Sequence, residues 1–258
     1  MNQIARIDRG SRPRRYLMRQ GGRLLRSLES LIARHSLIGD RPIFEPTVFP
    51  WSAALEAGWM VIRTELERVL ELRNMLPSFQ DISRDQMILT QDDQWKTFFL
   101  FGMGNRAKLN CAHCPETTRL VEQIPGMMTA FFSILGPGKH IPPHRGLFKG
   151  LIRYHLGLLV PEPAHACRIR VDDQIVHWEE GKSLVFDDTY EHEVWNETSG
   201  QRVVLFLDVL RPLPTPLALL NQSIIKMVSY SPYVQDARKN FQDWEKKLEV
   251  AHPGLRTS

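Results

Sequence analysis

Two of the nine histidines lie where strand-like stretches of the sequence end. His144 follows a Pro-Pro turn, and His192 follows the acidic stretch 187–191. Imidazoles are common metal ligands, and the mouth of a β-barrel is a usual place for a ligand or metal site. A third histidine, His155, and two arginines lie inside neighbouring strand-like stretches. A lone histidine is more often structural than a ligand, but this grouping favours a site.

The two arginines lie within otherwise apolar stretches. Arg153 belongs to the stretch 151–160, and Arg202 begins the stretch 202–209. Burying a guanidinium is costly without an anionic partner, and its planar fork matches a carboxylate in a way that lysine cannot reproduce. We therefore expect each arginine to meet a carboxylate, with a bound ligand as one source of it.

The region that carries these residues predicts a β-rich core. Between residues 128 and 212, short apolar stretches alternate with Gly, Pro and Asp turns at even spacing. This pattern is typical of a closed or double-sheet β structure. The stretches are 128–135, 151–160, 183–186, 192–195 and 202–209.

Helices are predicted before the β-rich region. Residues 51–73 have apolar side chains on one helical face, and Ser52 is a candidate N-cap. Residues 95–101 predict a strand buried on both faces. Cys111 and Cys114 form a CxxC, but without a second CxxC or a following pair of histidines it is a weak zinc signal. A turn before a helix is the preferred interpretation there.

The regions at both ends of the chain differ from the middle. Beyond Pro212, residues 217–230 predict an apolar helix and residues 234–250 a more polar one. We divide the chain into a basic N-terminal segment (1–40), the β-rich domain with packing helices (41–212) and a C-terminal helical extension (213–258).

The N-terminal segment is strongly basic. Residues 1–34 contain nine arginines and two acidic residues, a net charge of +7, and apolar residues recur at helical spacing from Leu17. A basic amphipathic helix is attracted to an anionic lipid surface. A basic tail followed by a helix packed on the domain is the alternative, and both stay open. Nucleic acid is not an expected partner, because aromatic residues are not interleaved and no reader motif follows.

Composition sets the broad class. The chain has 258 residues, of which 43% are hydrophobic and 24% charged, as in a water-soluble globular protein. It has no apolar run of transmembrane length and no secretory signal, and its three cysteines do not suit a disulfide framework. We therefore expect a cytoplasmic protein.

Several motifs together resemble the aspartyl/asparaginyl β-hydroxylase family. Members of this family are oxygenases that depend on Fe(II) and 2-oxoglutarate. The resemblance implies a mainly β fold with flanking helices, built on a double-stranded β-helix (a jelly-roll, cupin-like core). The matching stretches, in order and spacing, are 132–138, 144–146, 153–158, 178–181, 186–195 and 202–209.

The resemblance also implies roles for individual residues. His144 and His192 would ligate iron, and Arg202 with Ser133 would hold the distal carboxylate of 2-oxoglutarate. Arg153 and His155 would contact its metal-proximal end. Dioxygen would oxidise 2-oxoglutarate to succinate and carbon dioxide while a C–H bond of the acceptor becomes an alcohol.

The third iron ligand of ordinary non-haem oxygenases is missing from its usual place. An HxD motif would put a carboxylate two residues after His144, where this chain has Gly146, a glycine that the family shares. Asp187 and Asp188 are the nearest alternatives in the sequence, and we interpret them as turn and strand-end residues. The metal is thus expected on two histidines alone among side chains.

The acceptor is the least determined part of the prediction. Members of the family hydroxylate either aspartyl and asparaginyl side chains or acyl chains of membrane lipids. The basic N-terminal segment favours a lipid acyl chain, with peripheral contact on the inner face of the membrane. The alternatives are a peptide or amino-acid-like acceptor and a non-enzymatic, cupin-like binding protein.

Overall fold

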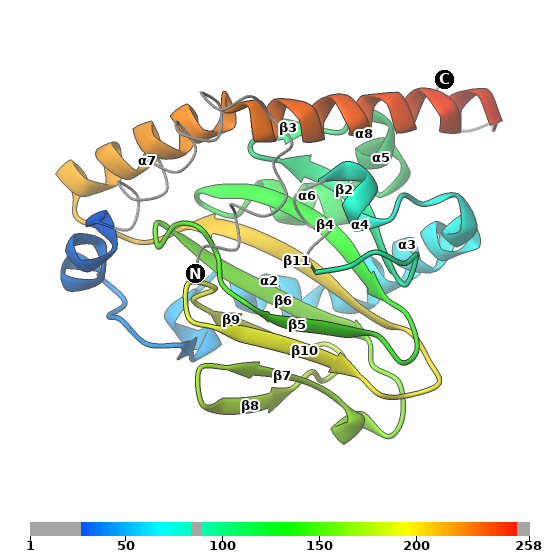
Figure 1. The fold of residues 1–258 in the computed structure, drawn as a ribbon, viewed down its shortest axis with the longest axis horizontal. Helices are drawn as coiled ribbons and strands as arrows, with labels where there is room; N and C mark the ends of the chain where they lie inside the picture. Colours follow the sequence, from blue (N-terminus) through cyan, green and yellow to red (C-terminus); the bar gives the residue numbers. More distant parts are fainter. Residues whose placement is uncertain (1–26, 84–88, 252–258) are drawn as a thin grey trace.

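Two antiparallel β-sheets face each other in the computed structural model, which describes residues 27–83 and 89–251 (Figure 1). The larger sheet has the order β1-β9-β6-β11-β4-β2-β3, and the smaller has the order β5-β10-β7-β8. The larger sheet consists of β1 (Ile43–Phe44), β2 (Trp95–Gly102), β3 (Asn105–Arg106), β4 (Met127–Leu135), β6 (Leu151–Leu159), β9 (Ser183–Phe186) and β11 (Arg202–Leu210). The smaller sheet consists of β5 (His140–His144), β7 (Cys167–Val171), β8 (Gln174–His177) and β10 (His192–Asn196).

The path of the chain from β4 onward is that of a double-stranded β-helix. The chain passes from β4 in the larger sheet to β5 in the smaller, returns to β6, crosses to the β7-β8 hairpin, and repeats the exchange through β9, β10 and β11. All pairings between these named strands are antiparallel. The predicted mainly β fold with a jelly-roll core is therefore confirmed.

Alternation along the strands assigns each side chain to one of two faces. In β11, Val203, Leu205 and Leu207 belong to an apolar cluster shared with the helices, whereas Val204 and Phe206 belong to a second apolar cluster between the sheets. Successive side chains of a strand point to opposite faces, so Arg202 lies on the inner face with Val204 and Phe206. By the same alternation, Arg153 and His155 of β6 also lie on the inner face of the larger sheet, because Tyr154 and Leu156 belong to the outer cluster.

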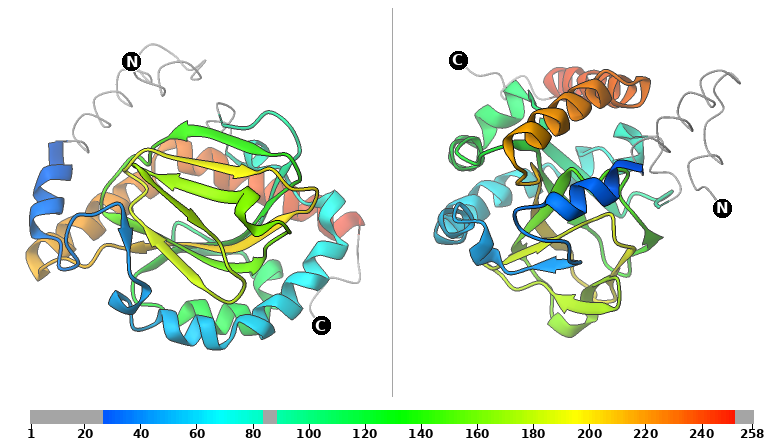
Figure 2. Two further views of the ribbon diagram at one scale, coloured as in Figure 1. Left: turned by 90° about the horizontal axis from the view of Figure 1, so that it is seen from below. Right: turned by 90° about the vertical axis from the view of Figure 1, so that its left-hand side faces the viewer.

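Short helices cover the outer face of the larger sheet (Figures 1 and 2). Leu55, Ile62 and Val121 of these helices are at most 1% exposed and share one cluster with the outer face of the strands. These helices are α2 (Ser52–Ala57), α3 (Trp59–Glu71), α5 (Lys108–His113) and α6 (Pro115–Glu122). The short helix α4 (Phe79–Ile82) instead packs through Phe79 against the cluster between the sheets. Short 3₁₀ turns occupy Pro46–Val48, Arg73–Met75 and Ala164–Ala166.

Three predictions for this region were wrong in detail. The helix expected over residues 51–73 is interrupted at Gly58, where a side chain would come within 2.8 Å of Leu120 on α6. Ser52 does not cap α2, because its hydroxyl donates to the carbonyl of Pro46. The CxxC region is not simply a turn, since Cys111 lies within α5.

The ends of the described chain pack together. Helical residues 27–35 lie beside α7 (Thr215–Ser229), and Ile32 shares a small apolar cluster with Leu213, Ile224 and Ile225. α8 (Pro232–Ala251) continues from α7 along the top of the molecule in Figure 1, so both predicted C-terminal helices are confirmed. The part of the expected N-terminal helix before residue 27 lies outside the described residues. No helix of the described residues meets the length and apolarity that a membrane span requires.

Candidate active site

The two predicted metal ligands face each other across paired strands. β10 pairs with β5 in a register that sets His192 opposite His144, and their ring centroids are 4.1 Å apart. Each ring has its Nδ1 within hydrogen-bond distance of a nearby carbonyl, 2.9 Å from Pro142 O for His144 and 3.0 Å from Tyr190 O for His192. A carbonyl only accepts, so Nδ1 carries the proton in both rings. Both Nε2 lone pairs are left for another partner.

Burial keeps this histidine pair neutral. Desolvation lowers the pKa of His144 to about 4 and holds the pKa of His192 well below its ordinary value, with the neighbouring imidazole adding to the effect at His192. Metal ligation requires the unprotonated imidazole, and this arrangement supplies it at neutral pH. The residues that the structure describes contain no group of three or more His, Cys, Asp or Glu side chains placed to hold a metal ion.

Aromatic rings connect the histidine pair to the centre of the larger sheet. The ring of Phe186 lies 5.5 Å from that of His192 and 5.2 Å from that of His155. Trp178 Nε1 donates to His155 Nδ1 over 3.2 Å, and the guanidinium of Arg202 lies 4.4 Å from the centre of the Trp178 ring. His144, His192, His155 and Arg202 thus belong to one continuous group between the sheets.

Arg202 and His155 have hydrogen-bond donors with no partner among the described residues. Arg202 is 2% exposed, and its Nε and Nη1 make no hydrogen bond. His155 Nε2 is also unpartnered, and it must carry the proton because Nδ1 accepts from Trp178. Burial lowers the pKa of Arg202 to about 10, so the group is still a cation at neutral pH. Unpaired buried donors on a cation match an anionic ligand.

Ser133 lies beside Arg202 on the inner face. In the β4-β11 ladder Ser133 pairs with Val204, two pairs along from the pair of Leu135 with Arg202. Trp95 Nε1 donates to Ser133 Oγ over 3.0 Å, so the hydroxyl proton is directed elsewhere. Sequence reasoning treated Trp95 only as the start of a buried strand, and no local motif marks it as the residue that orients Ser133.

Arg153 differs from Arg202. Its Nη2 lies 2.9 Å from Asp188 Oδ2, and its Nε donates to Asp208 Oδ1 over 3.1 Å. Its guanidinium also lies 4.4 Å from the centre of the Phe206 ring. The expectation that each arginine meets a carboxylate is therefore confirmed for Arg153, whose partners come from the protein, whereas the carboxylate expected at Arg202 remains a prediction. Contact between Arg153 and a cosubstrate remains a prediction.

Asp188 fills the space that a side chain at position 146 would need. A Cβ built on Gly146 would lie 2.3 Å from the carboxyl carbon and from both oxygens of Asp188, and Gly146 N donates to Asp188 O over 2.6 Å. Burial raises the pKa of Asp188 to about 6, although the Arg153 cation opposes that shift. The interpretation of Asp188 as a turn residue was incomplete, because the glycine admits a carboxylate from the β9-β10 loop.

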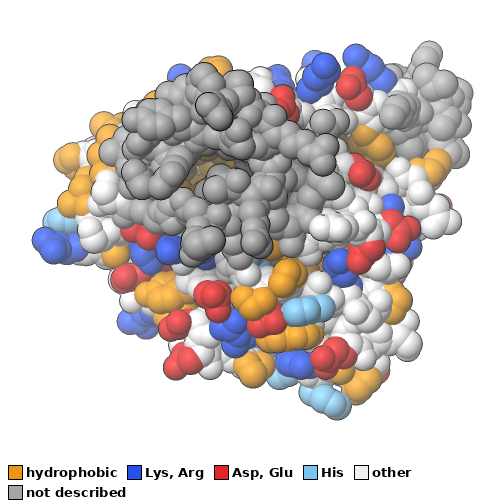
Figure 3. All heavy atoms as spheres, viewed as in Figure 1, with side chains coloured by type: hydrophobic (Ala, Val, Ile, Leu, Met, Phe, Trp, Pro, Cys, Tyr) orange, Lys and Arg blue, Asp and Glu red, His pale blue; other side chains and the backbone are white. Residues whose placement is uncertain are grey.

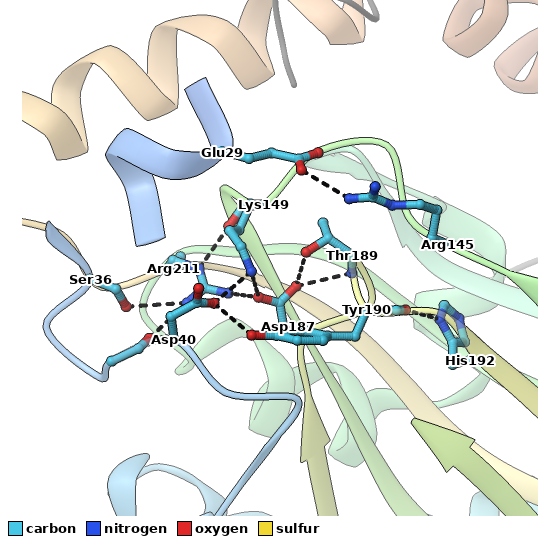
Figure 4. Close-up of polar contacts among 11 residues, drawn as sticks. Glu29, Ser36, Asp40, Arg145, Lys149, Asp187, Thr189, Tyr190, His192 and Arg211 are labelled. Carbon is cyan, nitrogen blue, oxygen red and sulfur yellow. Dashed lines mark hydrogen bonds and ion pairs between the residues drawn. The ribbon is translucent and has the colours of Figure 1, made fainter. Parts of the chain in front are cut away.

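Asp187 belongs to a different, fully buried network (Figure 4). One carboxylate oxygen accepts from Lys149 over 2.7 Å and from Arg211, and the other accepts from the backbone and hydroxyl of Thr189. Lys149 also contacts Asp40 over 2.7 Å. The network joins the segment before β1 to the loop that leads into His192, and local patterns could not indicate it because its members are far apart in the chain.

Comparison with known proteins adds the family context. Residues 56–212 match the family model described as aspartyl/asparaginyl beta-hydroxylase. The ornithine lipid ester-linked acyl 2-hydroxylase of Rhizobium tropici is 45% identical over 253 residues, covering 98% of this chain and 89% of that protein. The human aspartyl/asparaginyl beta-hydroxylase is 35% identical over 170 residues, 63% of this chain and 21% of that protein.

Similarity to solved structures is more distant. A cupin domain of an XRE-family transcriptional regulator from Enterobacter cloacae is 14% identical and has a TM-score of 0.31, covering 45% of this chain and 96% of that one. At that level of similarity, the fold assignment depends on the strand topology of this chain.

Proposed function

Since the chain belongs to the aspartyl/asparaginyl β-hydroxylase family, we propose that it is an Fe(II)- and 2-oxoglutarate-dependent hydroxylase of a membrane-lipid acyl chain. One observation carries the cosubstrate part of this proposal. Arg202 is a fully buried cation whose Nε and Nη1 have no partner among the described residues, beside the likewise unpartnered Nε2 of His155. A dicarboxylate with one end on these donors would satisfy them.

The histidine pair fits the metal. His144 and His192 would hold Fe(II) through Nε2, since both Nδ1 atoms are engaged by backbone carbonyls that fix the rings. When bound, the iron would couple the oxidation of 2-oxoglutarate to succinate and carbon dioxide by dioxygen to the insertion of one oxygen atom into a C–H bond. The two histidines leave more open positions than a three-ligand site does.

Side chains of the larger sheet would place the cosubstrate. Arg202 would bind the distal carboxylate through its fork, and Ser133, held by Trp95, would donate its hydroxyl proton to the same group. His155 would donate from Nε2 to the metal-proximal end, because Trp178 fixes its tautomer. The rings of Phe186, Phe206 and Trp178 would exclude water from this space, since they are at most 8% exposed.

The acyl-chain part of the proposal follows from the extent of the similarity. The Rhizobium tropici protein aligns over 98% of this chain, which must include most of the N- and C-terminal helices, whereas the family model ends at residue 212. That relative is named for 2-hydroxylation of an ester-linked acyl chain. We therefore propose carbon 2 of an ester-linked acyl chain on an amino-acid-containing lipid as the site of hydroxylation.

A peptide acceptor is the second candidate, and it is favoured by the human relative, which is named for aspartyl and asparaginyl residues. Purified protein with Fe(II), ascorbate and 2-oxoglutarate should be offered an ornithine lipid dispersed in detergent and, separately, aspartyl- and asparaginyl-containing peptides. We expect succinate formation to be stimulated by the lipid, with one oxygen atom added at carbon 2 of the ester-linked chain. If only the peptide stimulates succinate formation, the acceptor is a peptide and the proposed lipid acceptor is wrong.

The same assay tests the third possibility. A non-enzymatic cupin-like protein would form no succinate above the background of iron and ascorbate, with or without an acceptor. The matched control is the His192→Ala variant, which retains the rest of the pocket and should form none.

A further inference from the structure

The solvent-facing side of α7 is apolar, although the opposite side of the same helix is already buried. Leu219, Leu220, Met227 and Tyr230 are 59%, 44%, 68% and 70% exposed. Helical spacing puts these four on one side together with Ser223 and Lys226. We call these six residues the α7 face.

The other side of α7 supplies the packing that a surface helix normally needs. Ile224 and Ile225 are 8% and 2% exposed and belong to the cluster that joins α7 to the core. A surface helix usually has a polar side toward solvent, and contiguous exposed apolar residues mark a site of contact. Lys226 is the sole charged residue in Thr215–Ser229, so nothing acidic interrupts the α7 face.

Helical residues 27–35 extend the apolar surface. They lie beside α7 in both views of Figure 2, and hydrophobic side chains gather where α7 lies in Figure 3. Leu31 is 36% exposed, and a shallow groove between the two helices is lined by Leu28, Leu31, Leu217 and Leu220 among others.

The loop that follows His144 is attached to this surface. Arg145 Nη2 lies 2.9 Å from Oε2 of Glu29, which belongs to helical residues 27–35 (Figure 4). Phe148 packs in the cluster with Ile32 and Ile224. Asn221 of α7 donates to the carbonyl of Gly150 over 2.8 Å. The apolar helices and the metal-site loop are therefore one connected unit, and Leu147 in that loop is 50% exposed.

The charge of the adjoining chain identifies the partner. Residues 1–34 carry nine arginines and two acidic residues. This range includes most of helical residues 27–35 and the sequence before them. A cationic sequence that precedes an apolar surface in the chain suits a bilayer that contains anionic lipid, because lipid headgroups attract arginines and acyl chains accept apolar side chains. Tyr230 and Lys226 are residue types found at the headgroup level of membranes.

We propose that the α7 face docks on an anionic lipid bilayer, with Leu219, Leu220, Met227 and Tyr230 entering the interface. Docking would bring the loop after His144 to the membrane surface, where an acyl chain has to leave the bilayer. This role for the surface rests on the proposed lipid acceptor, but the docking itself is measured without turnover.

The test is flotation of the full-length, iron-loaded protein with vesicles of phosphatidylcholine and phosphatidylglycerol at low and high salt. High salt screens the arginines, so the binding that remains reports apolar insertion. We expect the double variant Leu219→Ser with Met227→Ser to weaken binding at high salt at least about tenfold. The matched control is Met60→Ser with Ile175→Ser, because these residues are both 56% exposed on α3 and β8, and it should bind like the original protein.

Three results would overturn the proposal. The first is no flotation of the original protein at low salt, and the second is equal binding by the two double variants. The third is a dimer in sedimentation that becomes a monomer in the α7 variant, which would assign the face to a second copy of this chain. Succinate formation with lipid dispersed in detergent should be equal in both variants. Vesicle binding without lipid hydroxylation would refute the proposed acceptor and leave the docking intact.

Discussion

Arg202 and Arg211 form a natural pair for testing the cosubstrate site. Both are 2% exposed, but their surroundings are opposite. Arg211 contacts the carboxylate of Asp187 and donates to the carbonyls of Lys149 and Gly39 and to the hydroxyl of Ser36. Arg202 has no partner for Nε or Nη1 among the described residues. The same substitution, Arg→Met, should therefore have different consequences at the two positions.

The expected magnitudes follow from these contacts. Burial lowers the pKa of Arg202 to about 10, a difference from its ordinary value that corresponds to a charge burial cost on the order of 3 kcal/mol. Arg202→Met removes this cost, so the free energy of unfolding of the ligand-free protein should be unchanged or higher by up to about 3 kcal/mol. Arg211→Met leaves Asp187 short of a cation and should lower that free energy by about 3–5 kcal/mol.

For the binding of 2-oxoglutarate, Arg202→Met should have the larger effect and Arg211→Met the smaller one. Truncating one partner of a desolvated charge pair costs about 2–5 kcal/mol, so Arg202→Met should raise the Kd of 2-oxoglutarate at least about thirtyfold. Arg202→Lys should recover only part of this loss, because an ammonium cannot form the bidentate contact. Arg211→Met should leave the Kd within about threefold of the original in the fraction that is folded.

Two measurements suffice for this test: urea unfolding of the metal-free protein, and anaerobic calorimetric titration of the metal-loaded protein with 2-oxoglutarate. The reasoning is refuted if Arg202→Met destabilises the ligand-free fold as much as Arg211→Met does while the Kd stays the same. In that case Arg202 would be a structural residue whose partner is internal.

Further predictions concern the histidines and the buried network. His144→Ala or His192→Ala should abolish bound iron, measured by elemental analysis, together with succinate formation, and full activity in both variants would contradict the two-histidine site. Asp187→Asn should lower the free energy of unfolding by about 3–5 kcal/mol in denaturant, because its buried cationic partners lose their counter-charge, and a loss below about 1 kcal/mol would show that the network is relaxed or hydrated. Asp188→Asn should retain bound iron, and loss of the metal would make Asp188 a ligand. The metal-free protein should lose stability as pH falls from about 6.5 toward 4, because the pKa of His144 is lowered to about 4 in the folded state and the unfolded chain takes up the proton first. His144→Gln should flatten that part of the stability-pH curve, and an unchanged slope would show that His144 does not cause it.

The sequence could predict those features that depend on local pattern. Alternation in the stretch around Arg153 and His155 requires both side chains to share one face of a strand, and β6 places both on the inner face of the larger sheet. The ends of β5 and β10 carry His144 and His192, as the strand-like stretches indicated. The helix interruption at Gly58 escaped prediction, and the close approach of Leu120 to Gly58 comes from a helix distant in the sequence.

Partners that come from distant parts of the chain could not be read from the sequence. Arg153 and Arg202 cannot be told apart from the sequence, because both are arginines within apolar strands. The difference arises because β6 pairs with both β9 and β11 in registers that set Arg153 opposite Phe186 and Asp208, which places two carboxylates near it. Arg202, at the other end of β11, has Leu135 opposite. Strand register, rather than local sequence, decides which arginine is left for a ligand.

The same dependence on register explains the glycine after His144. An HxD motif would supply a carboxylate from the strand that carries the first histidine, and its absence suggested a position with no acidic group. The structure instead places the Asp188 carboxylate where a Gly146 side chain would begin, held by Arg153 at 2.9 Å. Any larger residue at 146 would displace that carboxylate, so Gly146 and Asp188 constrain each other. An acidic group therefore lies beside Gly146, two residues after the first histidine, but it comes from the loop before the second histidine and is already paired with a cation.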